Sequence, residues 1–287
     1  MPEAINSLGI IAGSGELPFA IAEAARSEGR PIFVLALEGV TAANAVTTFP
    51  HAWVSLGELG KAIKHLHDAG CSEITFAGKV TRPEFAKLKL DARGALALPR
   101  VMAAAMKGDD AVQRAILSLF ENESWRIIGA DEAARGLLAP AGPLGNLEPT
   151  EEEESDILSA IRVVVALGAL DIGQAAVVCQ GLALAVEAAE GTDAMLTRVA
   201  MLPEAMRGTV ASRKGVLVKA VKPRQDRRVD LPVIGVKTVE LASLAGLSGI
   251  AVEQGAALIV GRARVAEAAD RAGIFVYGFA PEDYPRE

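Results

Sequence analysis

Short apolar runs alternate with longer mixed segments along the first half of the chain. Leu8–Ala12 and Ile32–Leu37 are continuous apolar runs, which are typical of buried parallel strands. A glycine turn and a helix-like segment from about Pro18 to Ser27 lie between them. This order of strand, glycine turn, helix and strand predicts one βαβ unit.

The same order repeats loosely to about residue 138. It predicts strands at Ala52–Leu56, Glu73–Ala77 and Trp125–Ile128, and helices at Glu58–Asp68, Ala95–Met106, Asp109–Glu121 and Ala130–Leu138. Alternation of this kind indicates an open, mainly parallel sheet with helices on its faces. We therefore expect an α/β fold that begins with a Rossmann-like domain over residues 1–138.

Prolines and glycines crowd the next segment, residues 139–150, which predicts a linker. An acidic run, Glu151–Glu154, follows it. Acidic side chains in the first turn of a helix complement the helix dipole. We interpret this run as the start of a helix rather than as a metal site.

The second half mixes strands and helices in a less regular order. It predicts helices at about Glu152–Leu167, Thr192–Met201, Thr238–Ala245 and Ala263–Ala272, and strands at Ala175–Gln180, Leu182–Glu187, Val216–Ala220 and Ile274–Phe279. Gly249–Gln254 and Ala257–Gly261 suggest a hairpin. We expect a second α/β domain with a mixed sheet over residues 151–287.

Composition narrows the class of protein. The 287 residues are 51% hydrophobic and only 4% aromatic, which suits two α/β cores. A net charge of −7 argues against a nucleic-acid partner. Cys71 and Cys179 form no CxxC motif, and the chain shows no signal-peptide pattern and no apolar run of 18 residues. We expect a cytoplasmic protein with reduced thiols.

The glycine turn carries the first candidate chemistry. Gly13, Ser14 and Gly15 follow a strand and precede a helix, where backbone N–H groups bind phosphate well. Glu38, after the next strand, suits a ribose hydroxyl. Pro18 stands where an NAD-binding motif has its third glycine, which argues against that version. A plain tight turn remains the alternative.

A second loop leaves the carboxyl end of a predicted strand, where open α/β sheets bind ligands. It comprises Gly78, Lys79, Val80, Thr81 and Arg82, and its two cations are placed for phosphates. An ordinary surface loop remains the alternative. Farther on, Asp109 is most simply a helix N-cap, whereas Asp110 suits a base or ribose.

Two acidic clusters lie in the second half. Glu187, Glu190, Thr192 and Asp193 gather at a strand-to-helix turn. Asp226 and Asp230 stand in a proline-braced loop among Lys219, Lys222, Arg224, Arg227 and Arg228. Hard oxygen ligands of this kind suit Mg²⁺ or Mn²⁺, and the cations suit a phosphate ester. A helix cap and a solvated loop remain the alternatives. No zinc pattern and no P-loop lysine occur.

Six motifs occur in the order of one known family. They are LGIIAGSGELP at 8–18, AGKVTRP at 77–83, KGDD at 107–110, DIGQ at 171–174, VEAAEGTDAM at 186–195 and KPRQDRRVDLP at 222–232. On these motifs the chain resembles the UDP-2,3-diacylglucosamine pyrophosphatases of the lipid A pathway, in their two-domain form. The resemblance covers nearly the whole chain, and it implies that the first domain, residues 1–138, binds the nucleotide and that the second, residues 151–287, is catalytic.

The resemblance implies hydrolysis of the UDP-sugar pyrophosphate to UMP and 2,3-diacylglucosamine 1-phosphate (lipid X), with water attacking the α-phosphorus and Mg²⁺ or Mn²⁺ as cofactor. The acids it favours for catalysis are Asp230, Asp193 and Asp226, and those for the metal are Asp230, Asp193 and Glu190. We expect the substrate to contact Gly13, Ser14, Gly15, Gly78, Lys79, Val80, Thr81, Arg82, Asp110, Gln180, Gly191, Thr192, Lys222 and Gln225. Which acid activates water stays open.

Two other functions compete with this interpretation. An NAD(P)-dependent oxidoreductase would use the glycine turn and Glu38 but leave both acidic clusters without a role. A non-catalytic module that senses UDP-nucleotides would need no metal. For the hydrolase, a lipid-like substrate is consistent with peripheral contact at the cytoplasmic face of the inner membrane, although no basic amphipathic helix stands out. A homodimer is also consistent with the sequence.

Overall fold

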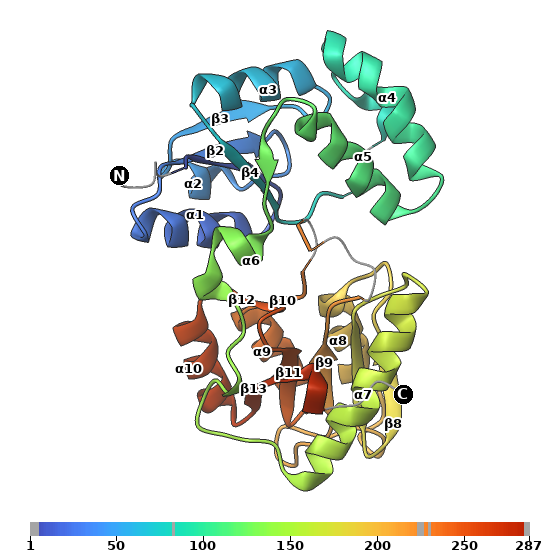
Figure 1. Cartoon of the computed structure of the whole chain (residues 1–287). Helices are drawn as coiled ribbons and strands as arrows, with labels where there is room; N and C mark the ends of the chain where they lie inside the picture. The colour runs from blue at the N-terminus through green and yellow to red at the C-terminus, as the bar shows by residue number, and fades with distance from the viewer. Residues whose placement is uncertain (1–5, 82–83, 223–226, 229–230, 284–287) are drawn as a thin grey trace. The chain divides into compact units, whose positions relative to one another are not determined.

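The computed structural model describes residues 6–81, 84–222, 227–228 and 231–283 (Figure 1). The chain divides into two compact units. The N-terminal unit comprises residues 1–136 and 226–230, and the C-terminal unit comprises residues 137–225 and 231–287. Both are α/β, as the sequence predicts. None of the described helices is long and apolar enough to span a bilayer.

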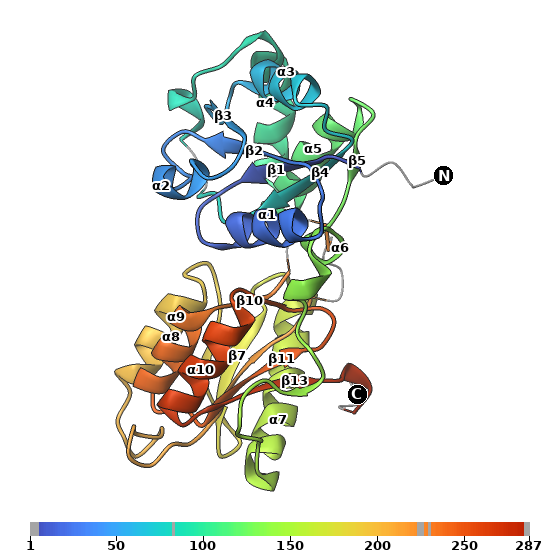
Figure 2. The same ribbon diagram turned by 90° about the vertical axis from the view of Figure 1, so that its left-hand side faces the viewer.

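A five-stranded parallel sheet forms the centre of the N-terminal unit (Figure 2). In spatial order its strands are β3 (His51–Val54), β2 (Ile32–Leu37), β1 (Leu8–Ala12), β4 (Glu73–Ala77) and β5 (Arg126–Ile127). The predicted parallel sheet is therefore confirmed. All five residues of β1 are buried, as its unbroken apolar sequence requires for a central strand. The carboxyl ends of all five strands meet at one edge, which places the two loops singled out from the sequence together.

Helices cover both faces of this sheet. They are α1 (Leu17–Ser27), α2 (Ala43–Val46), α3 (Leu59–Asp68), α4 (Ala92–Ala105), α5 (Asp109–Glu121) and α6 (Ala130–Ala133), with 3₁₀ turns at Phe85–Lys87 and Arg135–Leu137. Leu66 of α3 and Leu117 of α5 pack with Leu35 and Ile74 on one face. The predicted helix at 130–138 is wrong in extent, because the backbone of Ala134 leaves the helical region.

The C-terminal unit contains a mixed six-stranded sheet, as predicted. In spatial order its strands are β6 (Gly142–Pro143), β13 (Phe275–Phe279), β11 (Gly249–Glu253), β9 (Val216–Lys219), β7 (Ala175–Cys179) and β8 (Leu182–Val186). Strands β9, β11 and β13 are parallel, β7 is antiparallel to β9, and β8 is antiparallel to β7. Strand β8 therefore runs in the direction of β9, and four strands end at the same edge. Strand β6 lies in the segment predicted as a linker.

The predicted hairpin between residues 249 and 261 is wrong. Strand β11 pairs with β9 on one side and β13 on the other, so both of its edges are occupied. The chain turns away after Glu253, and β12 (Leu258–Ile259) pairs instead with β10 (Val233–Ile234) in a separate parallel pair. Sequence pattern alone gave no sign of this long-range pairing.

Helix α7 (Glu151–Ala169) packs on one face of the mixed sheet, where Ile157 and Ile161 contact Val178 and Val218. The other face is covered by α8 (Thr192–Ala200), α9 (Val236–Leu244) and α10 (Arg262–Ala272), and a 3₁₀ turn follows at Pro281–Asp283. The acidic run does begin a helix. Thr150 and Glu153 form a reciprocal capping box at its start.

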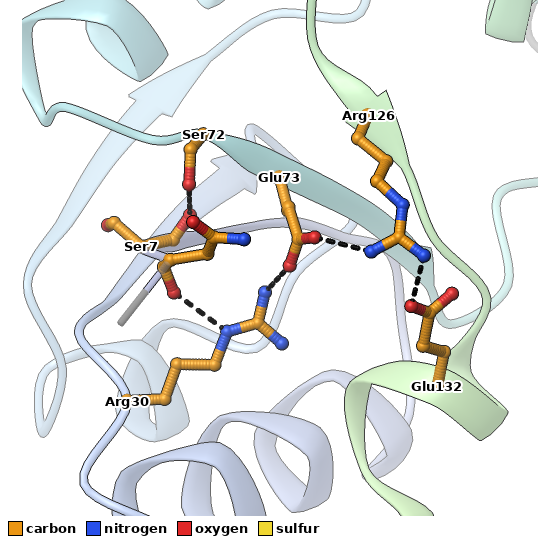
Figure 3. A network of polar contacts seen from close by, with 7 residues as sticks. Ser7, Arg30, Ser72, Glu73, Arg126 and Glu132 are labelled. Carbon is orange, nitrogen blue, oxygen red and sulfur yellow. Dashed lines mark hydrogen bonds and ion pairs between the residues drawn. The ribbon is translucent and has the colours of Figure 1, made fainter. Parts of the chain in front are cut away.

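A buried carboxylate, Glu73, marks the amino end of β4 (Figure 3). It accepts hydrogen bonds from the guanidinium groups of Arg30 and Arg126, and Arg126 also binds Glu132. Arg30 in addition donates to the backbone oxygen of Asn6 over 2.9 Å. A buried charge needs partners of this kind. Because the network lies at the edge where the strands begin, we infer that it stabilises the N-terminal unit.

Candidate functional site

Two loops at the carboxyl edge of the N-terminal sheet are tied to each other. Ser14 N donates to the Lys79 carbonyl over 2.9 Å, and Lys79 N donates to the Ser14 carbonyl over 3.1 Å. The Ser14 hydroxyl also donates to the Lys79 carbonyl, at 2.8 Å. Gly13 N binds the carbonyl of Ala77 at 2.7 Å. The structure therefore brings the β1–α1 loop and the loop after β4 into one surface.

The three predicted glycines have different physical roles. A Cβ at Gly13 would lie 2.8 Å from the backbone of Gly78 and Lys79, and one at Gly78 would lie 2.5 Å from the Ser14 oxygen. These two glycines allow the loops to touch. Gly15 has φ +93° and open space where a Cβ would stand. Only Gly15 therefore combines a left-handed backbone with room for a ligand to approach.

The surface around these loops has features that suit an anion. Helix α1 begins at Leu17, and its first backbone N–H groups lie at the end of β1. Lys79, Val80 and Thr81 are exposed beside it. Arg82 lies outside the described residues. Glu38, considered for a ribose, accepts a hydrogen bond from the Ser55 hydroxyl.

Helix α5 begins differently from the expectation. Its N-cap is Gly108, with φ +114°, so Asp109 is the first helical residue and not the cap. Asp110 lies in the first turn of the helix, and its side chain is outside the described part of the structure. A contact between Asp110 and the substrate stays a prediction.

A chain of hydrogen bonds joins three side chains at the carboxyl edge of the C-terminal sheet. Lys219, the last residue of β9, donates from Nζ to Thr192 Oγ1 at 2.8 Å and to the Val233 carbonyl at 3.1 Å. Thr192 Oγ1 in turn donates to Glu187 Oε1 at 2.5 Å. Lys219 and Glu187 are buried. The arrangement fixes an ammonium group where the turn after β8 meets β9.

The DIGQ motif, residues 171–174, contacts Glu187 at the same edge of the sheet. Gln174 N donates to Glu187 Oε2 at 3.2 Å. A Cβ at Gly173 would lie 2.1 Å from the Glu187 carbonyl, so glycine is required for this approach. The side-chain oxygen of Gln174 is buried without a hydrogen-bond partner among the described residues. A buried acceptor of that kind calls for a donor from water or a ligand.

Lys222 continues the cationic side of this edge. Its Nζ binds Asp171 Oδ1 at 2.9 Å, and only 14% of its side chain is exposed. Asp171 adopts φ +56°, a left-handed conformation that aspartate tolerates. Two lysines, Lys219 and Lys222, are thus held by side chains from the loops around them. Gln225, Asp226 and Asp230 lie outside the described residues.

The predicted metal ligands differ in how they are engaged. Glu190 binds Arg198 at 2.8 Å, and hydrogen bonds from the backbone and from Arg198 lower the pKa of its carboxyl. Asp193 pairs with Lys237 at 2.7 Å, and both side chains are at least half exposed. No group of three metal-ligating side chains occurs among the residues described. Asp193 suits the role of a metal ligand, because an exposed ion pair with Lys237 is easily replaced by a metal ion. Glu190 suits that role poorly, because Arg198 and the backbone already bind its carboxylate.

Gly191 and Thr192 belong to the turn that carries these groups. Gly191 is the N-cap of α8 with φ +80°, which glycine adopts without strain. Neither Thr192 nor Asp193 caps the helix, although the sequence allowed that interpretation. The hydroxyl of Thr192 is used instead in the bond to Lys219.

Gln180 is not brought to this edge. It directly follows β7, which runs antiparallel to β8 and β9, and so it lies at the opposite edge of the sheet. Its backbone N–H donates to the buried carboxylate of Asp156 at 2.8 Å, and Gly181 N does the same at 2.7 Å. The positive φ of Gln180, +51°, thus serves a tight turn capped by α7. Substrate contact by Gln180 has no support in this geometry.

The charged loop belongs to both units. Arg227 and Arg228 are grouped with the N-terminal unit, where they pair with Asp131 at 3.5 Å and Glu121 at 2.7 Å. Lys219 and Lys222 belong to the C-terminal unit. The basic side chains that look alike in the sequence therefore fall into two sets with different partners.

Sequence reasoning placed Lys219 and Glu187 in the charged clusters but included neither among the predicted substrate contacts or metal ligands, and it did not select Asp171. A signal was present for Lys219, because its charge directly ends the buried strand β9, whereas Glu187 follows a strand that begins exposed. A charged residue in that position must find a partner. Asp171 carried no such signal, since its bond to Lys222 spans 51 residues.

Comparison with known proteins gives consistent matches over both halves. Residues 7–137 match the LpxI N-terminal domain, and residues 140–277 match the LpxI C-terminal domain. The chain is 49% identical over 281 residues to a Caulobacter vibrioides protein named UDP-2,3-diacylglucosamine pyrophosphatase LpxI. That alignment covers 98% of this chain and all of the relative.

Proposed function

Because the chain belongs to the LpxI family, we propose that it hydrolyses the pyrophosphate bond of UDP-2,3-diacylglucosamine. The products are UMP and 2,3-diacylglucosamine 1-phosphate. One P–O bond forms to the water oxygen, the bridging P–O bond breaks, and the water gives up a proton. The observation that carries the proposal is the 49% identity to a named pyrophosphatase across the full length of both chains.

The polar edge of the C-terminal sheet supports this chemistry. Cleavage of a pyrophosphate moves negative charge onto the leaving phosphate, and fixed cations stabilise that charge. Lys219 is held by Thr192, and Lys222 is held by Asp171. We assign these two lysines to the phosphates. Their supporting side chains keep the ammonium groups in place before the substrate arrives, so little reorganisation is needed.

We assign the nucleotide to the N-terminal unit. Its parallel strand order β3-β2-β1-β4-β5 corresponds to five strands of the doubly wound order, in which ligands bind outside the carboxyl ends. The open approach at Gly15 and the N-terminus of α1 suit a phosphate of UDP. Lys79 supplies a cation beside them.

We further propose that Mg²⁺ or Mn²⁺ binds with Asp193 and Asp230 as ligands. The exposed carboxylate of Asp193 supports this assignment, whereas Glu190 is engaged with Arg198. A bound divalent cation would neutralise phosphate charge and lower the pKa of bound water. Which of Asp193, Asp226 and Asp230 accepts the proton of water is a question for the variants below.

The test is turnover of UDP-2,3-diacylglucosamine in ¹⁸O-water, with Mg²⁺ or with EDTA. We expect UMP and lipid X to form with Mg²⁺ only. Label in UMP agrees with the α-phosphorus attack that we propose, and label in lipid X places the attack on the other phosphorus. UDP binding without turnover would overturn the hydrolase and favour the sensing module.

The oxidoreductase alternative has no support in the comparisons, which lead only to a pyrophosphatase family. Two finer expectations remain proposals. We propose peripheral association with the cytoplasmic face of the inner membrane, because the substrate is a lipid. A homodimer is a further prediction, and light scattering at several protein concentrations tests it.

A further inference from the structure

Helix α4 exposes an apolar face to solvent. Leu96 is 83% exposed, Met106 at the C-cap is 90% exposed, and Met102 is 46% exposed. Smaller exposed residues fill the spaces along the same side of the helix; they are Ala92, Ala95, Pro99 and Ala103. Their spacing of three and four residues places all seven on one stripe.

The opposite side of α4 packs against the rest of the N-terminal unit. Gly94 and Ala105 are buried, and Ala97, Leu98, Val101 and Ala104 are partly buried. This side packs against α5 and α3 (Figure 1). The helix is therefore already anchored, and its exposed apolar stripe has no role in the core of the N-terminal unit.

A basic stripe borders the apolar one. Arg93, Arg100 and Lys107 follow each other at intervals of seven residues, and all three are exposed. At 100° per residue these positions share one side of the helix, next to Leu96. Residues 84–108 contain five basic and two acidic residues, a net charge of +3 in a chain of −7. Asp91, the N-cap of α4, accepts hydrogen bonds from Gly94 N and Lys61 N, and Glu123 pairs with Arg93 at 2.6 Å, which leaves Arg100 and Lys107 as the cations of the stripe that the proposal uses.

We propose that α4 docks this protein on an anionic lipid bilayer surface. A helix with an apolar stripe and a basic border lies in the plane of a bilayer, with the apolar side in the acyl boundary and the cations among anionic headgroups. Leu96, Met102 and Met106 form the apolar insertion. Arg100 and Lys107 face the headgroups. The basic border favours an anionic partner over a second copy of the same positive surface.

No basic amphipathic helix stands out in the sequence, and the composition of α4 explains why. The sequence of α4 is apolar on nearly every side, so its pattern alone does not distinguish the packed face from the free one. The burial of Gly94 and Ala105 makes that distinction. Binding to lipid tests the proposal without any assumption about catalysis.

The test is co-sedimentation of the full chain with vesicles of phosphatidylcholine, with and without phosphatidylglycerol. We expect binding to the anionic vesicles, weakened by salt. The double variant Leu96→Asp, Met106→Asp should lose at least tenfold in partition, and Arg100→Ala about fivefold. A matched control is Met201→Asp, Leu244→Asp, which alters two side chains that are 80% and 65% exposed on the C-terminal unit.

Because the altered residues are exposed, the thermal midpoint of every variant should stay near that of the wild type, and circular dichroism checks this. Equal partition of wild type and the α4 double variant would overturn the proposal. A wild-type dimer that the α4 variant dissociates, with no vesicle binding by either, would assign the stripe to a second copy instead. Loss of partition only in the control would also contradict it.

Discussion

Lys219 Nζ lies 2.8 Å from Thr192 Oγ1, so the last residue of β9 is joined to the first residue of α8. The threonine hydroxyl has a single proton, and it gives that proton to Glu187. Its lone pairs therefore face the lysine, and the direction of both hydrogen bonds is fixed. The buried ammonium group of Lys219 is therefore linked to the carboxylate of Glu187 through the hydroxyl of Thr192.

The valine variant of Thr192 tests this relationship. Thr192→Val keeps the shape of the side chain but removes both hydrogen bonds, which leaves Lys219 and Glu187 short of a partner. We expect a loss of about 1–3 kcal/mol in the free energy of unfolding, measured with urea. We also expect kcat/KM to fall about tenfold or more, because the cation is no longer fixed near the phosphates.

Thr197→Val is the matched control on the same helix. Thr197 is exposed, and its hydroxyl binds only the carbonyl of Asp193 four residues earlier. Loss of this hydroxyl should change the free energy of unfolding by less than about 0.5 kcal/mol. Equal effects of the two substitutions would show that the Lys219 contact has no special importance.

The two acids of the turn after β8 should respond differently to substitution. Asp193→Asn should raise the Mg²⁺ concentration needed for half-maximal turnover about tenfold or more, since its carboxylate is a proposed ligand. Glu190→Gln should leave the Mg²⁺ requirement nearly unchanged, because Arg198 and the backbone hold that carboxylate. Titration of activity with Mg²⁺ measures both. A larger effect at Glu190 would reverse our assignment.

Local patterns predicted much of the fold. The strand Leu8–Ala12 is found at its predicted bounds, because an unbroken apolar run between a polar start and a glycine turn permits little else. The start of α7 was also predicted within one residue, because the acidic run Glu151–Glu154 suits the first turn of a helix. Signals of this kind lie entirely within a short segment.

The unsuccessful predictions involve partners far apart in the chain. Ala257–Gly261 looked like half of a hairpin, but β12 pairs with β10, which has only two residues and no pattern of its own. Strand direction is equally invisible in a segment: β7 carries Gln180 to the other edge of the sheet, so its predicted contact with the substrate stays a prediction. Register and strand direction arise from the whole sheet, so segment patterns cannot supply them.

Gly13 is needed for the packing of two loops, whereas Gly15 leaves room for a ligand. Gly13→Ala places a Cβ 2.8 Å from the backbone of the loop after β4, which cannot move away without breaking the Ser14–Lys79 hydrogen bonds. We expect a loss of about 1–3 kcal/mol in unfolding free energy, by urea titration, and weaker UMP binding, by calorimetry. Gly136→Ala is the control, because a Cβ there meets nothing within 4 Å. Comparable losses from both would contradict this explanation.

The network around Glu73 should matter for stability and not for catalysis. Glu73→Gln removes the charge that two guanidinium groups share at the amino end of β4. We expect a loss of about 3 kcal/mol in the free energy of unfolding, since a partner of a buried ion pair is removed. The value of kcat should stay within about twofold, because the network lies at the edge away from both polar loops. A large fall in kcat with unchanged stability would give the network a catalytic role.

A further carboxylate, Glu58, sets a dependence of stability on pH. It is buried at the start of α3, accepts from Lys61 at 2.5 Å and from Ser55 N at 3.1 Å, and lies 3.4 Å from Lys89. These contacts, the Lys61 hydrogen bond above all, lower its pKa from 4.5 to about 2. Since the folded pKa is the lower one, ionised Glu58 stabilises the fold fully above pH 4.5 and loses that effect as the pH falls toward 2.

Glu58→Gln removes this contribution at neutral pH. We expect the variant to be less stable than the wild type near pH 7 and the difference to shrink steadily by about pH 3, as measured by urea unfolding at each pH. Glu28→Gln, at an exposed position, serves as the control and should follow the wild type throughout. A gap between wild type and Glu58→Gln that stays constant from neutral to acid pH would mean that the carboxylate acts through its shape and not through its charge.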